Sequence, residues 1–128
     1  MALGLHTNFT LDMVPGGPPP ILHASAGDVV RLFTANLTYN GVPYDIQGNV
    51  VKIRGTKPDG SGFEEDPDDY ERDDSWVDIM LTEQMTNVPG RVVCEIVEKL
   101  NTSDVIGSAN FILEVEEPAY TAVSSPSA

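Results

Sequence analysis

The side chains with the greatest chemical potential are one cysteine and two histidines, and their spacing does not assemble a catalytic site. Cys94 is the single cysteine, so no disulfide forms within the chain, and its neighbours Val93 and Glu95 supply no base that would make it a nucleophile. His6 and His23 lack a paired nucleophile, and a zinc site needs three or four nitrogen or sulfur ligands. The sequence therefore predicts a buried thiol at Cys94 and a protein that is not an enzyme.

Acidic residues gather between positions 64 and 75, where calcium binding is the chemistry to consider. Calcium takes several oxygen ligands, but an EF-hand loop alternates its carboxylates and places glycine at its sixth position. The run contains no glycine, and carboxylates that cleave glycosidic bonds need rigid elements to hold them. We expect a solvated acidic loop over residues 64–75, and no catalytic, cofactor-binding or metal-binding residue in the chain. The acids considered are Asp66, Asp68, Asp69, Glu71, Asp73 and Asp74.

Charge and hydropathy exclude two classes of partner. The formal net charge is −13, from 20 acidic and 7 basic residues. Phosphate neutralisation dominates nucleic-acid affinity, so this balance argues against DNA or RNA, and it equally opposes anionic membrane surfaces. No apolar run approaches the roughly 20 residues of a membrane span, and the first residues do not have the pattern of a secretory signal. We therefore expect neither a nucleic acid nor a membrane as partner.

The elements that must position any functional side chain are strands, because the dominant hydrophobic period is two. Alternation predicts strands near residues 9–13, 21–25, 29–39, 51–54, 76–81, 92–96 and 105–116, with a short one at Phe63. Asn40-Gly41 and residues 57–62 predict turns, and residues 82–87 a helical turn. These features predict an all-β fold, an immunoglobulin-like antiparallel β-sandwich of about seven to eight strands without its disulfide. A small barrel is the alternative.

The chain divides into one domain over residues 1–118, with a Pro/Gly-rich loop at 15–20, and an Ala/Ser/Pro-rich tail over 119–128. Function on a sandwich resides in its loops. A proline-rich loop loses little conformational entropy when a partner orders it, because its φ angles are already restricted. Tyrosines near turns are candidate anchors, although packing beside a turn is the alternative reading for two of them, Tyr39 and Tyr44. The candidate interface residues are Pro18, Pro19, Pro20, Tyr39, Tyr44, Tyr70 and Tyr120.

Five fragments in order resemble one known family. They are residues 4–12 (GLHTNFTLD), 55–63 (GTKPDGSGF), 82–86 (TEQMT), Gly90 with Cys94-Glu95, and 105–111 (VIGSANF). Together they resemble the N-terminal immunoglobulin-like domain of the upper baseplate proteins of tailed bacteriophages from Gram-positive hosts. The resemblance covers about residues 3 to 118. The chain departs from the family in its acidic stretch, and it ends at Ala128, where family members continue, so the resemblance implies that a distal module is missing.

The resemblance implies a virion structural protein, a baseplate or tail adaptor that docks by oligomeric assembly and supports host-recognition modules. Its partners would be other phage structural proteins of tail, baseplate or capsid, with a homo-oligomer within the particle. The particle would be assembled in the bacterial host cytoplasm. A capsid decoration or head-fibre protein is the first alternative. A carbohydrate-binding module is the second, and it would need an exposed row of aromatics on one sheet face.

Overall fold

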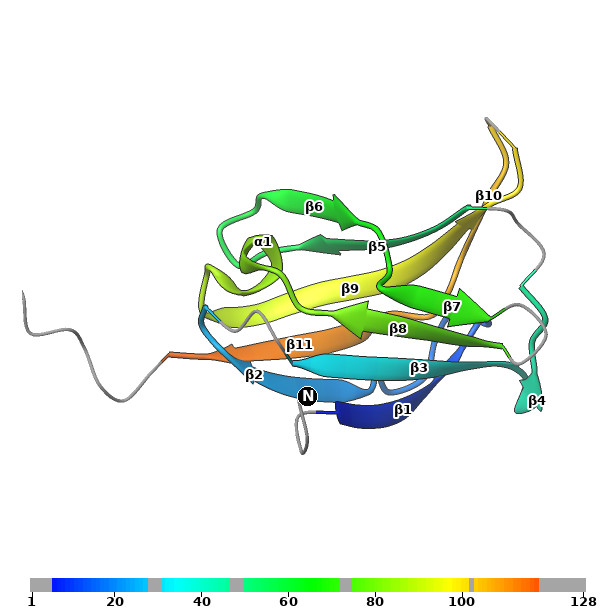
Figure 1. Cartoon of the computed structure of the whole chain (residues 1–128), viewed down its shortest axis with the longest axis horizontal. Helices are drawn as coiled ribbons and strands as arrows, with labels where there is room; N and C mark the ends of the chain where they lie inside the picture. Colours follow the sequence, from blue (N-terminus) through cyan, green and yellow to red (C-terminus); the bar gives the residue numbers. More distant parts are fainter. Residues whose placement is uncertain (1–5, 28–30, 47–49, 72–74, 102, 118–128) are drawn as a thin grey trace, which may run out of the picture.

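The computed structural model describes residues 6–27, 31–46, 50–71, 75–101 and 103–117, and within them the chain forms two packed β-sheets (Figure 1). One sheet has the order β1-β3-β8-β7, with β4 paired to β3. The other has the order β2-β11-β9-β5-β6, with β10 paired to β9. The predicted all-β sandwich is confirmed at this level.

The strands of the five-stranded sheet in the described residues are β1 (His6–Asp12), β3 (Leu32–Tyr39), β4 (Val42–Pro43), β7 (Asp69–Glu71) and β8 (Trp76–Met80). Those of the six-stranded sheet are β2 (Ile21–Ser25), β5 (Val50–Thr56), β6 (Gly62–Glu65), β9 (Gly90–Lys99), β10 (Val105–Gly107) and β11 (Phe111–Glu116). A single helical turn, α1 (Glu83–Thr86), follows β8 and confirms the prediction for residues 82–87.

The core lies between the sheets, because alternate residues of each strand point inward. From the five-stranded sheet these include Phe33 and Val77, and from the six-stranded sheet Ile96 and Leu113, all buried. Cys94 belongs to this inner row and is 2% exposed, which confirms the buried thiol. Burial raises the pKa of the Cys94 thiol to about 12, so the neutral form persists in the folded protein.

The prediction of a purely antiparallel sandwich was wrong at both chain ends. β1 runs parallel to β3, and β2 runs parallel to β11. The cause is the chain path. After β1 the chain passes through the other sheet as β2 and returns for β3, so no tight hairpin forces β1 and β3 to run in opposite directions. Periodicity reports which face a residue occupies and carries no information on strand direction.

The described strands also exceed the seven to eight predicted, because short pairings are invisible to a period-two pattern. β4, β7 and β10 have two or three residues each. The strand predicted over 105–116 is interrupted by residues 108–110, where the Ser108 amide donates to the Ile96 carbonyl at 2.8 Å and the Ala109 amide to the Asp12 carbonyl at 2.9 Å. Ala109 thereby ties the six-stranded sheet to the end of β1.

The expected acidic loop over 64–75 was also partly wrong. Glu64 and Glu65 belong to β6, and Asp69 to Glu71 form β7, which pairs with β8. An edge strand leaves one side open to solvent, so carboxylates fit there without burial. Residues 72–74, which include Asp73 and Asp74, lie outside the described residues.

The turn predictions are confirmed. Asn40 and Gly41 have φ angles of 53° and 84°, as a type I′ hairpin turn requires, and they join β3 to β4. Residues 57–61 form the connection between β5 and β6, where the Gly60 amide donates to the Lys57 carbonyl at 2.9 Å. These turns fix the register of the strands that carry the candidate interface residues.

Candidate functional site

The Pro/Gly-rich segment over residues 15–20 connects the two sheets. It leaves β1 in one sheet and enters β2 in the other. Pro18 and Pro19 are exposed, Pro20 is half-buried, and the Pro20 carbonyl accepts a hydrogen bond from the Ile112 amide at 2.8 Å. Gly16 and Gly17 have φ angles of 109° and 77°, which other residues rarely adopt. The segment is thus anchored at its end and open to a partner at Pro18 and Pro19.

Asp12 joins the start of this segment to the β3–β4 hairpin. Its side-chain oxygens accept hydrogen bonds from the amides of Val14 (2.8 Å), Asn40 (3.3 Å) and Gly41 (3.2 Å), and from the Thr38 hydroxyl (3.1 Å). The Val14 amide bond, followed by the other three bonds, holds the pKa of this carboxyl below its usual value despite some desolvation. The carboxylate therefore acts as a common acceptor that holds two loops at one end of the sandwich.

Two tyrosines lie on the hairpin side of this end. The rings of Tyr39 and Tyr44 stack with centroids 6.4 Å apart and an interplanar angle of 24°. Tyr39 is 53% exposed, whereas Tyr44 is half-buried and donates its hydroxyl to Glu98 of β9, a carboxylate that is only 2% exposed. Burial, followed by the bond to Glu98, raises the pKa of Tyr44 above its ordinary value. Tyr44 is a structural support, and Tyr39 is the ring that a partner can reach.

Replacing Tyr44 with phenylalanine should lower the free energy of unfolding by about 1–3 kcal/mol, because a buried carboxylate loses a hydrogen-bond donor. Because the folded-state pKa of Tyr44 lies above the ordinary 10.0, its contribution is present below pH 10 and declines above it. Urea unfolding at neutral pH and near pH 10.5 measures both effects. The control is Tyr39→Phe, which should change stability by less than about 0.5 kcal/mol. Equal losses for the two variants would contradict the assigned support role.

A recess of about 190 Å³ adjoins the Pro/Gly segment, lined by Pro15, Gly16, Gly17, Pro19 and Asn110. A larger one of about 340 Å³ also has Asn110 at its rim. It lies over β5, β6 and β9, with Arg54, Gly55, Phe63, Val93 and Glu95 in its lining. The shared Asn110 makes the two hollows neighbours, so the Pro/Gly segment borders a surface with both apolar and charged contacts.

The remaining predicted residues are Tyr70 and Tyr120. Tyr70 is a residue of the edge strand β7, paired with Val77, and Tyr120 lies outside the described residues. Asp12 links Val14, just before the Pro/Gly segment, to Asn40 and Gly41 of the hairpin turn that follows Tyr39. Sequence reasoning missed Asp12 and Glu98. An aspartate two residues before the amide it binds is a known turn signal, so Asp12 was detectable, but a glutamate in the inner row of a strand gave none.

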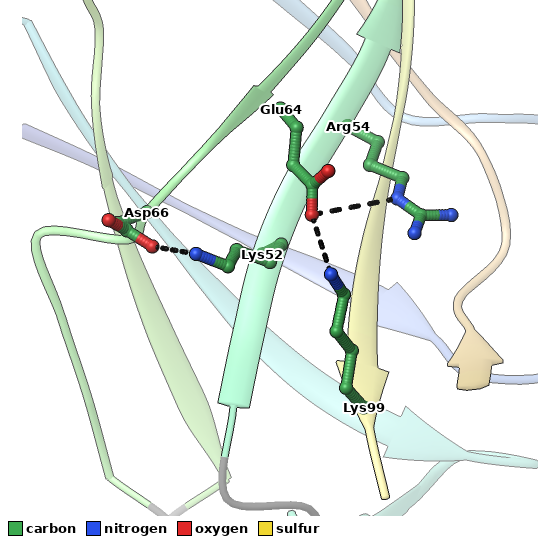
Figure 2. A network of polar contacts seen from close by, with 5 residues as sticks. All are labelled: Lys52, Arg54, Glu64, Asp66 and Lys99. Atoms are coloured by element: carbon green, nitrogen blue, oxygen red, sulfur yellow. Dashed lines mark hydrogen bonds and ion pairs between the residues drawn. The ribbon is translucent and has the colours of Figure 1, made fainter. Parts of the chain in front are cut away.

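Charged side chains cover the outer face of β5 and β6 (Figure 2). Lys52 pairs with Asp66, and Glu64 lies between Lys99 at 3.1 Å and Arg54 at 4.0 Å. The hydrogen bond from Lys99 lowers the pKa of Glu64, and the bond to Asp66 raises that of Lys52. Exposed ion pairs of this kind contribute little to stability, so their effect is to set the polarity of this face.

The described residues also bear on metal sites and membrane spans. No group of three or more histidines, cysteines or acids gathers there as metal ligands would. No helix in those ranges is long and apolar enough to cross a membrane.

Comparison with known proteins bears on the fold of this chain. No protein-family model matches the chain, and no curated protein matches its sequence. Among solved structures, it is similar to the N-terminal domain of ORF48 of phage TP901-1, with a TM-score of 0.70 and 16% sequence identity. The match covers 87% of this chain and 98% of that domain. Over the part that the match covers, this chain therefore has the fold of a phage protein domain.

Proposed function

We propose that this chain is a structural domain of a phage particle, a baseplate or tail adaptor that docks by assembly with other virion proteins and supports host-recognition modules. The observation that carries the proposal is the fold shared with the N-terminal domain of ORF48 of phage TP901-1. The five sequence fragments that resemble upper baseplate proteins support it independently of the fold. The immunoglobulin-like class of the sandwich is part of the same proposal.

The docking surface in this proposal is the end of the sandwich that carries residues 15–20 and the β3–β4 hairpin. It combines exposed prolines, a reachable aromatic ring at Tyr39 and a recess beside Asn110. Preformed loops lose little entropy on binding, and the carboxylate of Asp12 holds both loops in place. A carbohydrate-binding module is less well supported, because Tyr39 is the one aromatic among the large exposed apolar side chains for which the structure describes burial, a set that leaves out Tyr70.

Replacing Pro18 and Pro19 together with serine should weaken docking by at most roughly 4- to 30-fold, since each proline restricts the chain by about 0.4–1 kcal/mol. The free energy of unfolding should fall by no more than about 2 kcal/mol, because both side chains are exposed and the loss comes only from the freer unfolded chain. The readout is binding of added protein to particles that lack the chain. Pro89→Ser, at an exposed proline between α1 and β9, is the matched control. Unchanged binding of the double variant would remove the Pro/Gly segment from the docking surface.

Fractionation of particles tests the function itself. Heads and tails are separated from particles produced by the organism that encodes the chain, and each fraction is analysed by mass spectrometry. The proposal predicts the chain in the tail fraction. Recovery with heads would favour the capsid decoration or head-fibre alternative, and absence from both fractions would overturn a virion role.

A further inference from the structure

The larger recess, over β5, β6 and β9, exists because small residues adjoin long ones on the outer face of the six-stranded sheet. Thr56 of β5 is paired with Gly62 of β6 on one side and with Val93 of β9 on the other. Paired residues of neighbouring strands direct their side chains to the same face, and Gly62 has no side chain to fill its place. The resulting hollow of about 340 Å³ is within the size range of protein binding pockets.

An apolar strip joins this recess to the Pro/Gly segment. Ile112 of β11 is paired with Val93 on one side and with Ile21 of β2 on the other. All three side chains lie on the outer face, because the core takes the alternate residues of each strand. Val93 is 42% exposed and Ile21 is 45% exposed. Since Ile21 directly follows Pro20, and Asn110 borders both recesses, the strip and the recess continue the proposed docking surface onto the face of the sheet.

Two side chains of opposite charge border the recess and turn to different neighbours. Arg54 and Glu95 are cross-strand partners on β5 and β9. Arg54 turns its Nε toward Glu64, at 4.0 Å, and its two terminal nitrogens point away from that carboxylate in Figure 2. Glu95 lies over Gly107 instead, where a Cβ would meet its Oε1 at 2.9 Å. Within the described residues, no ion pair or hydrogen bond engages the half-buried Glu95 side chain.

We propose that this recess receives a segment of a neighbouring virion protein, which packs an apolar side chain against Val93 and sets a lysine or arginine against Glu95. A half-buried carboxylate is stabilised by a charge-assisted hydrogen bond, and a cation of the partner supplies one. The net charge of −13 also favours the approach of a basic partner surface. The terminal nitrogens of Arg54 can donate to a backbone carbonyl of the same segment. The inference rests on the proposed function, which supplies the neighbour, and deepens it by naming the chemistry of the contact.

Binding of the added full chain to particles that lack it tests the contact. Glu95→Gln should weaken binding at least about 10-fold, because a charge-assisted hydrogen bond is lost, and Glu95→Lys should weaken it further through repulsion. Val93→Ser should weaken binding roughly 5-fold, because apolar burial is lost. Added salt should weaken binding of the unaltered chain more than that of Glu95→Gln. Glu116→Gln is the matched control, since this exposed carboxylate of β11 does not line the recess, and it should change binding less than about 2-fold.

The outcomes separate this inference from the proposed function. Failure of the unaltered chain to bind would overturn the docking function and this inference with it. Binding that Glu95→Gln and Val93→Ser leave unchanged would overturn the inference alone. Stronger binding of Glu95→Lys would show an acidic occupant, and a dimer of the purified chain that Glu95→Gln abolishes would show that a second copy fills the recess; either result overturns the inference. Urea unfolding of each variant should show a retained fold, because both substituted side chains are partly exposed.

Discussion

Phe111→Ala should lower the free energy of unfolding by about 3–5 kcal/mol, a large fraction of the stability of a domain of this size. Phe111 is 2% exposed on β11, the strand that pairs with both β9 and β2. Its ring lies 5.3 Å from that of Phe9 on β1, tilted by 50°, so it packs across the sheets. Removing the ring leaves a cavity between β1 and β11, and β11 is also the strand to which β2 pairs.

Urea unfolding measures this loss, with Phe111→Leu as the control that keeps most of the buried volume and should cost roughly 1.5 kcal/mol or less. Phe9→Ala should cost less than Phe111→Ala, because Phe9 is only half-buried. A loss below about 1 kcal/mol for Phe111→Ala would contradict the placement of this ring in the core.

Gly55→Ala should destabilise the domain by about 1–3 kcal/mol or more, although alanine is ordinarily the milder residue in a strand. A Cβ at position 55 would lie 2.5 Å from Cε2 and Cζ of Phe63 and 3.1 Å from the Val93 carbonyl oxygen. The ring of Phe63 occupies the space that glycine leaves open, so the added methyl must displace it.

A double-mutant cycle tests this steric cause. Phe63→Leu alone removes packing, but in the Gly55→Ala background it should restore part of the lost stability, with a coupling of at least about 1 kcal/mol. Additive losses in the two backgrounds would show that the cost of Gly55→Ala arises elsewhere. Gly62→Ala is the matched control, because a Cβ there meets only the Gly55 carbonyl, at 3.4 Å.

The fragments that resemble upper baseplate proteins prove to be contact partners. Lys57, in the turn after β5, donates from Nζ to the side-chain oxygens of Gln84 at 3.0 Å and Asn87 at 3.2 Å, beside α1. A Cβ on Gly90, whose φ is 123°, would lie 2.8 Å from Cγ of Pro58. Residues separated in sequence therefore depend on one another for space and hydrogen bonds.

Strand positions and turns were predictable because each depends on neighbouring residues. Alternation located most strands, and Asn40-Gly41 identified a hairpin whose φ angles only such residues adopt readily. The parallel pairings of β1 and β2 were not predictable, because they depend on a chain path through both sheets. β7 was missed because an acidic composition predicts a loop, whereas an open edge accepts carboxylates on a strand.

The candidate surface was predictable where its residues are marked by their neighbours in the sequence. Proline and glycine content marked residues 15–20, and tyrosines beside a turn marked Tyr39 and Tyr44. The difference between the two tyrosines was not predictable, because Glu98, which binds Tyr44, is 54 residues away along the chain. The coupling of the two loops through Asp12 likewise spans 28 residues to Asn40.

Cryo-electron microscopy of the particle that contains this chain tests the central claim most directly. We expect a two-sheet domain in the baseplate or tail, with residues 15–20 and the β3–β4 hairpin against a neighbouring virion protein. A sandwich that faces the neighbour with another surface would contradict the docking end. Density for the domain on the capsid alone, or nowhere in the particle, would contradict its role as a baseplate or tail adaptor.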